Sequence, residues 1–167
     1  MKGIMKQIVD RTVLLVLVGL LASTAAFAKT PLEGTWKVME QTTTGPNGTT
    51  NKNPQPGLFI FTGKYYSIFM VNGDKPRAEL PQDLNTATAE QFRDAWRFIA
   101  NTGTYEIKAN ELTTHPIVAK SARAMLQAGS FDTFRFKVDG NMLTITRTGS
   151  SDGAVNNGMT AQLIRVE

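Results

Sequence analysis

From residue 32 onward, apolar and polar residues alternate with a period of two over most of the chain. In segment 32–43 the alternation places Leu32, Trp36 and Val38 on one side and mainly polar residues on the other. This pattern predicts a strand with one buried face. Seven further segments read as strands, at 58–62, 65–71, 104–108, 111–118, 131–139, 142–148 and 159–166.

One segment has a helical period instead. Apolar residues Phe92, Trp96 and Ile99 recur at spacings of four and three, with charged residues between them. A capping-box sequence at 88–91 precedes them, which is typical of a helix start. The pattern predicts one amphipathic helix over 88–100.

The predicted hairpin 58–71 is apolar on both faces. Leu58 and Ile60 alternate with Phe59 and Phe61, so only one of these pairs can face the inside of a sheet. We therefore expect the predicted helix to cover the other face.

Eight consecutive strands with mostly short connections predict an all-β fold. Antiparallel strands in this number close into an up-and-down barrel whose interior holds packed side chains or one small ligand. The polar segments 44–56 and 149–158 are predicted loops. Segment 119–129 is compatible with a short helix or with an irregular loop over the barrel mouth.

The N-terminal segment has the composition of a secretory signal peptide. Lys2, Lys6 and Arg11 precede an apolar run at 13–22, and a small-x-small sequence follows at 26–28. The apolar run is shorter than the roughly 20 residues that a spanning helix needs. We expect cleavage after Ala28 and a periplasmic or secreted protein.

Two segments follow from this expectation: a signal peptide at 1–28 and one barrel domain at 29–167. Cleavage would lower the formal net charge from +4 to about +2, because it removes three cations and one anion. Such a charge does not favour nucleic acid as a partner, and no stable membrane anchor is expected after cleavage.

The chain has one His and no Cys, so we expect no metal site and no cofactor. The oligomeric state is not indicated.

Several segments, in this order, resemble the bacterial lipocalin-like domain family. They include Gly34-Thr35-Trp36 at the head of the first strand and the segments 53–61, 63–67 and 98–107. The resemblance implies a calyx-like barrel that belongs with the lipocalins, and a hydrophobic ligand.

Three residues are expected to have structural roles. Gly34 lets the backbone bend where the chain enters the barrel, and Trp36 is a large apolar group for the closed end. The resemblance to lipocalins further implies an Arg lying over this Trp, which is Arg165 or, as the second candidate, Arg147.

The candidate ligand-binding residues are polar or aromatic residues of the strands. Tyr66, Tyr105, His115 and Arg135 are the groups best able to orient a ligand, and Phe134 is an apolar lining residue. A cationic Arg135 would favour a carboxylate-bearing ligand. Each also has a structural alternative, as a core or surface strand residue.

Three functions remain open from the sequence. The first is binding of an apolar or amphipathic small molecule in the barrel. The second is an isomerase- or hydrolase-type enzyme in the same cavity, with His115 as acid/base and Tyr105 as its partner. The third is a filled barrel that binds another envelope protein through its surface.

Overall fold

The computed structural model describes residues 30–155 and 158–167. Pro31–Glu167 form one compact unit. The predicted signal peptide at 1–28 lies outside the described residues, and its cleavage remains an expectation.

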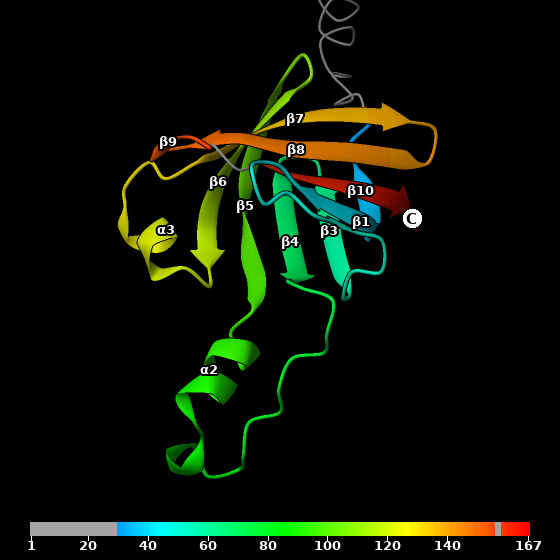
Figure 1. Cartoon of the computed structure of the whole chain (residues 1–167). Helices are drawn as coiled ribbons and strands as arrows, with labels where there is room; N and C mark the ends of the chain where they lie inside the picture. The colour runs from blue at the N-terminus through cyan, green and yellow to red at the C-terminus, as the bar shows by residue number, and fades with distance from the viewer. Residues whose placement is uncertain (1–29, 156–157) are drawn as a thin grey trace, which may run out of the picture. The chain divides into compact units, whose positions relative to one another are not determined.

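Eight long antiparallel strands form a closed barrel (Figure 1). They are β1 (Gly34–Thr43), β3 (Gly57–Thr62), β4 (Tyr65–Val71), β5 (Phe98–Lys108), β6 (Glu111–Ala119), β7 (Asp132–Asp139), β8 (Met142–Ser150) and β10 (Met159–Arg165). Consecutive long strands pair with each other, and β10 closes the barrel by pairing with both β1 and β8. The predicted eight-stranded up-and-down barrel is confirmed. Two-residue strands β2 (Thr50–Asn51) and β9 (Gly153–Ala154) lie in the predicted loops.

The two ends of the barrel differ in their connections. Tight turns at 63–64, 109–110 and 140–141 join strands at one end, where β1 also begins and β10 also ends. The other end carries the four longer connections, at 44–56, 72–97, 120–131 and 151–158. We call the first end the closed end and the second the mouth. A ligand that enters the barrel would pass these longer connections.

The core is the inner face of the barrel. In β3 the buried side chains are Phe59 and Phe61, whereas Leu58 and Ile60 lie on the outer face and are exposed. In β1 the buried residues include Trp36 and Val38, as the alternation predicts.

The closed end contains the Trp–Arg contact that the resemblance to lipocalins implies, and its first candidate, Arg165, makes it. Trp36 is fully buried, and the guanidinium carbon of Arg165 lies 4.0 Å from the centre of its ring. The indole Nε1 donates to the carbonyl of Leu32 at 2.8 Å, so its polar atom is satisfied. Arg165 also donates to the carbonyls of Pro31 and Glu33. These contacts tie the start of the barrel to its last strand.

The predicted helix 88–100 is too long. Helix α2 spans Ala89–Ala95, and Thr88 and Gln91 form the predicted capping box. Phe98 and the residues after it belong to β5 and pair with β4, so that Ile99 lies opposite Met70. Pairing with β4 therefore makes residues 98–100 part of a strand, although their local apolar spacing favours a helix.

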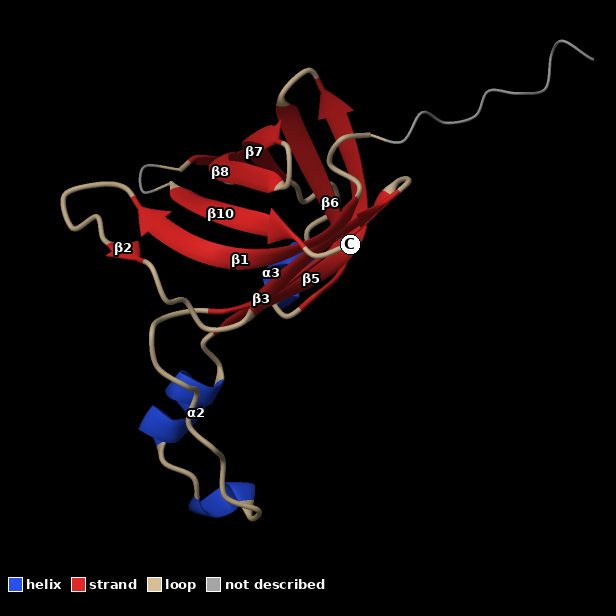
Figure 2. Cartoon of the chain, turned by 90° about the vertical axis from the view of Figure 1, so that its right-hand side faces the viewer, coloured by secondary structure: helices blue, strands red, loops and turns tan. Residues whose placement is uncertain are grey.

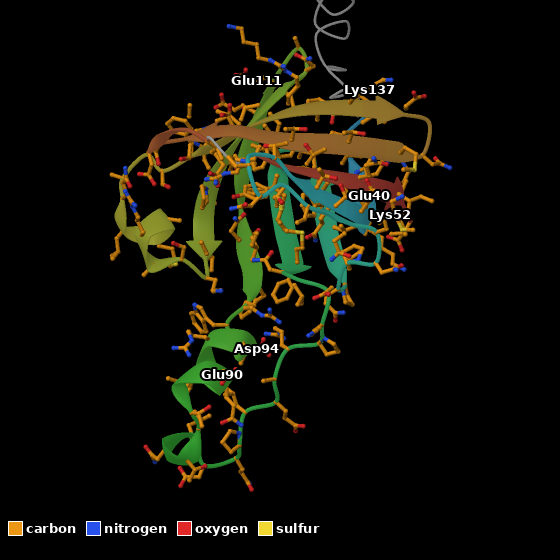
Figure 3. The ribbon with its side chains drawn as sticks, viewed as in Figure 1. Glu40, Lys52, Glu90, Asp94, Glu111 and Lys137 are labelled. Atoms are coloured by element: carbon orange, nitrogen blue, oxygen red, sulfur yellow. The ribbon has the colours of Figure 1, made fainter. Side chains whose placement is uncertain are left out.

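Helix α2 also does not cover the barrel wall, contrary to expectation. It lies on the connection 72–97, which we call the arm. The arm extends beyond the ends of β4 and β5 (Figure 1) and points away from the strands in the second view as well (Figure 2). The short 3-10 helix Leu84–Thr86 lies on the same arm. Phe92 is 43% exposed and Trp96 is 62% exposed. Within the arm, Asp94, labelled in Figure 3, accepts from the backbone of Ala78 and pairs with Arg97 at 2.7 Å. At the base of the arm, the Trp96 ring packs against Phe98, and Lys120 lies over it.

The uncertain segment 119–129 contains a short helix, α3 (Ala122–Leu126). Of the two alternatives left open by the sequence, the helical one is correct. Helix α3 follows β6 on the connection to β7 and lies beside the barrel mouth (Figure 1).

Candidate ligand cavity and its polar end

A cavity of about 320 Å³ lies inside the barrel toward the mouth. Its apolar lining comes from six side chains on five strands: Phe59, Ile68, Met70, Ile99, Phe134 and Met159. Its polar lining consists of Asn101, Asp132 and Arg147. A mostly apolar wall with a few polar groups is typical of small-molecule sites, and the volume is at the lower end of their range of about 300–1,000 Å³.

Asp132 and Arg147 form an ion pair across β7 and β8. The Nε of Arg147 donates to Oδ1 of Asp132 at 3.0 Å, and Nη2 contacts the same oxygen. The side chains are 37% (Arg147) and 24% (Asp132) exposed, so solvent screens the pair only in part.

A β-bulge accompanies this pair. Thr133 lies opposite Gly149 and Phe134 lies opposite Arg147, so β8 has one extra residue, Thr148. Bulges of this kind are common at barrel rims. Arg147 comes just before the bulge, continues the inward-facing positions of Leu143 and Ile145, and lies on the cavity side across from Phe134.

A second hollow, of about 290 Å³, lies at the mouth between β5, β6, α3 and the end of β8. It shares Ile99, Asn101, Asp132 and Arg147 with the interior cavity. The ion pair and Asn101 therefore lie at the boundary between the two spaces. Lys120, Arg123 and Asp152 are further polar residues of the hollow, and the last two form an exposed ion pair at 2.7 Å.

Asn101 carries an enclosed and unsatisfied polar atom. Its Oδ1 is shielded from solvent and accepts no hydrogen bond from the described residues. An enclosed acceptor without a donor costs about 1–3 kcal/mol. A group bound in the cavity could supply the missing donor.

Tyr66 is buried in the core near this polar end. Burial raises the pKa of Tyr66 to about 12; the Thr114 hydroxyl opposes this shift, and the charge of Asp132 adds to it. The Tyr66 hydroxyl is sealed from solvent and makes no well-formed hydrogen bond within the described ranges. The phenol is therefore neutral over the whole physiological pH range.

Three of the five candidate residues point inward. Phe134 lines the cavity. Tyr66 and Tyr105 belong to the buried core but are not among the residues that line the cavity. The Tyr105 ring packs edge-on against Phe61 with centroids 5.4 Å apart.

The other two candidates, His115 and Arg135, lie outside the barrel. His115 lies opposite Thr104 at an outward-facing position of the β5–β6 pair, whereas Tyr105 lies opposite the buried Thr114. The His115 ring lies 6.5 Å from that of Phe131. Arg135 alternates with the buried Phe134 and Phe136 and is exposed. The structure thus does not bring His115 to Tyr105, and it does not place Arg135 in the cavity.

The polar residues of the cavity, Asn101, Asp132 and Arg147, are not among the ligand-binding residues predicted from the sequence. For Arg147 a signal was present, because Leu143 and Ile145 precede it on the inward-facing positions of the same strand. Asn101 could not be identified because it followed the overlong predicted helix.

Groups of three or more His, Cys, Asp or Glu side chains that could hold a metal ion are not found within residues 30–155 and 158–167. None of the helices in the described part of the chain has the length and apolar content needed to cross a membrane.

Comparison with known proteins places the chain in a family. No curated protein matches it. The chain is similar to the crystal structure of an uncharacterized protein from Bacteroides eggerthii DSM 20697, with 12% identity and a TM-score of 0.44, over 80% of this chain and 98% of that one. The model of a family described as a lipocalin-like domain matches residues 33–164. With this match over most of its length, the chain belongs to the lipocalin-like domain family.

Proposed function

We propose that this protein is an exported binding protein that holds a small apolar or amphipathic molecule inside its barrel. The observation that carries the proposal is the interior cavity of about 320 Å³ with its six apolar lining residues. Burial of apolar ligand surface against this wall would drive binding, at roughly 25 cal/mol per Å². The boundary with the mouth hollow gives the ligand a route in and a place for a polar end.

The binding hypothesis is better supported by the geometry than its two alternatives. The enzymatic alternative paired His115 with Tyr105, which lie on opposite faces of the sheet. The alternative of a filled barrel does not account for the cavity.

Export is supported by the N-terminal sequence pattern alone. If the protein is exported, N-terminal sequencing of the periplasmic or secreted fraction should give Lys29 as the first residue. Full-length protein retained in a membrane fraction would contradict this part of the proposal.

Binding is tested with the fluorescent apolar probe N-phenyl-1-naphthylamine. The parent protein should bind the probe with a strong increase in emission. Met159→Trp places a large ring at the cavity wall and should reduce binding at least about tenfold, whereas the matched substitution Met142→Trp, at an exposed position, should not. Native mass spectrometry of protein purified from its own host should show a bound small molecule. Equal probe binding by the parent and both variants would contradict an interior site.

A further inference from the structure

The charges that line the interior cavity cancel. Its only charged lining residues in the described structure are Arg147 and Asp132, and they pair with each other. Arg135, the cation from which a carboxylate ligand was expected, lies on the outer face. The cavity therefore holds no uncompensated charge for an ionic ligand.

An ionic ligand would also have to break this pair. A carboxylate that bound Arg147 would compete with Asp132 and place a second negative charge beside it. An ammonium group that bound Asp132 would do the same to Arg147. In a partly desolvated site, leaving one charge without its partner is costly.

The hydrogen-bonding groups of the cavity indicate what the ligand carries instead. The enclosed Oδ1 of Asn101 lacks a donor, and the same side-chain amide has an NH₂ group that donates. Whichever way this amide is turned, it is satisfied by a group that both donates and accepts. Hydroxyl and primary amide groups do both, whereas a carboxylate only accepts and an ammonium only donates.

We infer that the ligand is an uncharged amphiphile whose hydroxyl or amide group binds at Asn101, beside the Asp132–Arg147 pair. This inference rests on the proposed binding function and specifies its ligand class. The polar end lies at the boundary between the cavity and the mouth hollow. The apolar part lies against the apolar lining, which includes Phe59, Ile68 and Phe134.

The test compares four compounds with the same ten-carbon chain: decanol, decanamide, decanoate and decylamine. Each is titrated at neutral pH as a competitor of bound N-phenyl-1-naphthylamine. We expect decanol and decanamide to displace the probe at concentrations at least about tenfold lower than the two charged compounds. This comparison uses only the parent protein, so its result does not depend on whether a variant folds.

Two substitutions examine the reason for this selectivity. Asp132→Asn leaves Arg147 without its anionic partner and should improve decanoate binding about tenfold or more. Asn101→Leu removes the amide and should weaken decanol and decanamide binding several-fold, with less effect on decanoate. Arg135→Gln on the outer face is the control and should change none of the four affinities.

The outcomes separate the two proposals. If the parent protein binds the probe but prefers decanoate or decylamine, the inferred ligand class is wrong and the binding function stands. If the parent does not bind the probe, the proposed function fails and this inference fails with it.

Discussion

Gly34 has no side chain where Arg165 crosses the start of the first strand. A Cβ atom at Gly34 would overlap with Nη1 of Arg165 and with the backbone carbonyl of Glu167. Gly34 also has φ of +135°, a conformation that other residues rarely adopt. The Gly of the Gly34-Thr35-Trp36 sequence thus leaves room for the arginine that stacks on the Trp.

Gly34→Ala should destabilise the protein by about 2–4 kcal/mol, because it combines backbone strain with a steric conflict. Urea unfolding at neutral pH measures the change. Gly63→Ala is the control: it also has a positive φ, but a Cβ there meets no atom within 4 Å, so its cost should be smaller, about 1 kcal/mol. Equal losses for the two variants would mean that the Arg165 contact is unimportant.

The two tryptophans should respond very differently to truncation. Trp36→Ala removes a fully buried ring at the closed end and should cost about 3–5 kcal/mol. Trp96→Ala removes an exposed ring of the arm and should cost about 1 kcal/mol or less. Urea unfolding of both variants tests the packing of the closed end and the exposure of the arm together. A large loss for Trp96→Ala would show that the arm folds against the barrel in solution.

The sequence predicts features that repeat within one strand better than features that depend on pairing between strands. Alternation alone identifies Trp36 and Val38 as core residues, and eight such segments imply a closed barrel. The spacing of Phe92, Trp96 and Ile99 fits a helix equally well on local grounds. The pairing of Ile99 with Met70 overrides it, and that pairing involves residues far apart in the chain.

The candidate site was harder to predict for the same reason. Asp132 and Arg147 come together because β7 and β8 are neighbours and because Arg147 lies opposite Phe134, two residues from Asp132. Neither a period nor a motif within one strand encodes that pairing. By contrast, the outward position of Arg135 follows from its alternation with Phe134 and Phe136, which is visible in the sequence.

Tyr66 should make the protein less stable at alkaline pH. Burial raises the pKa of Tyr66 to about 12 in the folded protein, whereas a tyrosine in the unfolded chain ionises near pH 10. Between these values the unfolded state has lost the proton that the folded state still holds. The free energy of unfolding therefore falls as pH rises from about 10 to 12, by about 2 kcal/mol from this group. Below pH 9 the group should contribute no pH dependence.

Tyr66→Phe isolates this effect, because the phenylalanine cannot ionise. The difference in unfolding free energy between parent and variant should be constant from pH 7 to 9 and should shift in favour of the variant above pH 10. Urea unfolding at a series of pH values measures it. A constant difference up to pH 12 would contradict the burial of the phenol.

His115→Ala should leave binding of N-phenyl-1-naphthylamine unchanged within about twofold. His115 faces outward on β6, opposite Thr104, and does not line the interior cavity. Fluorescence titration of the parent and the variant measures both affinities. A tenfold loss of affinity would indicate that the ligand binds outside the interior cavity.

The Asp132–Arg147 pair should show strong non-additivity. Arg147→Met leaves the Asp132 carboxylate facing the cavity without its cation, which should cost about 1–3 kcal/mol; partial exposure of both side chains keeps the cost below that of a fully buried pair. Asp132→Asn in the same protein removes that unpaired charge, so the double variant should recover most of the loss. Urea unfolding of the parent, both single variants and the double variant gives the coupling energy directly. Additive losses would mean that the two side chains do not interact in solution, and the charge balance of the cavity would then need another explanation.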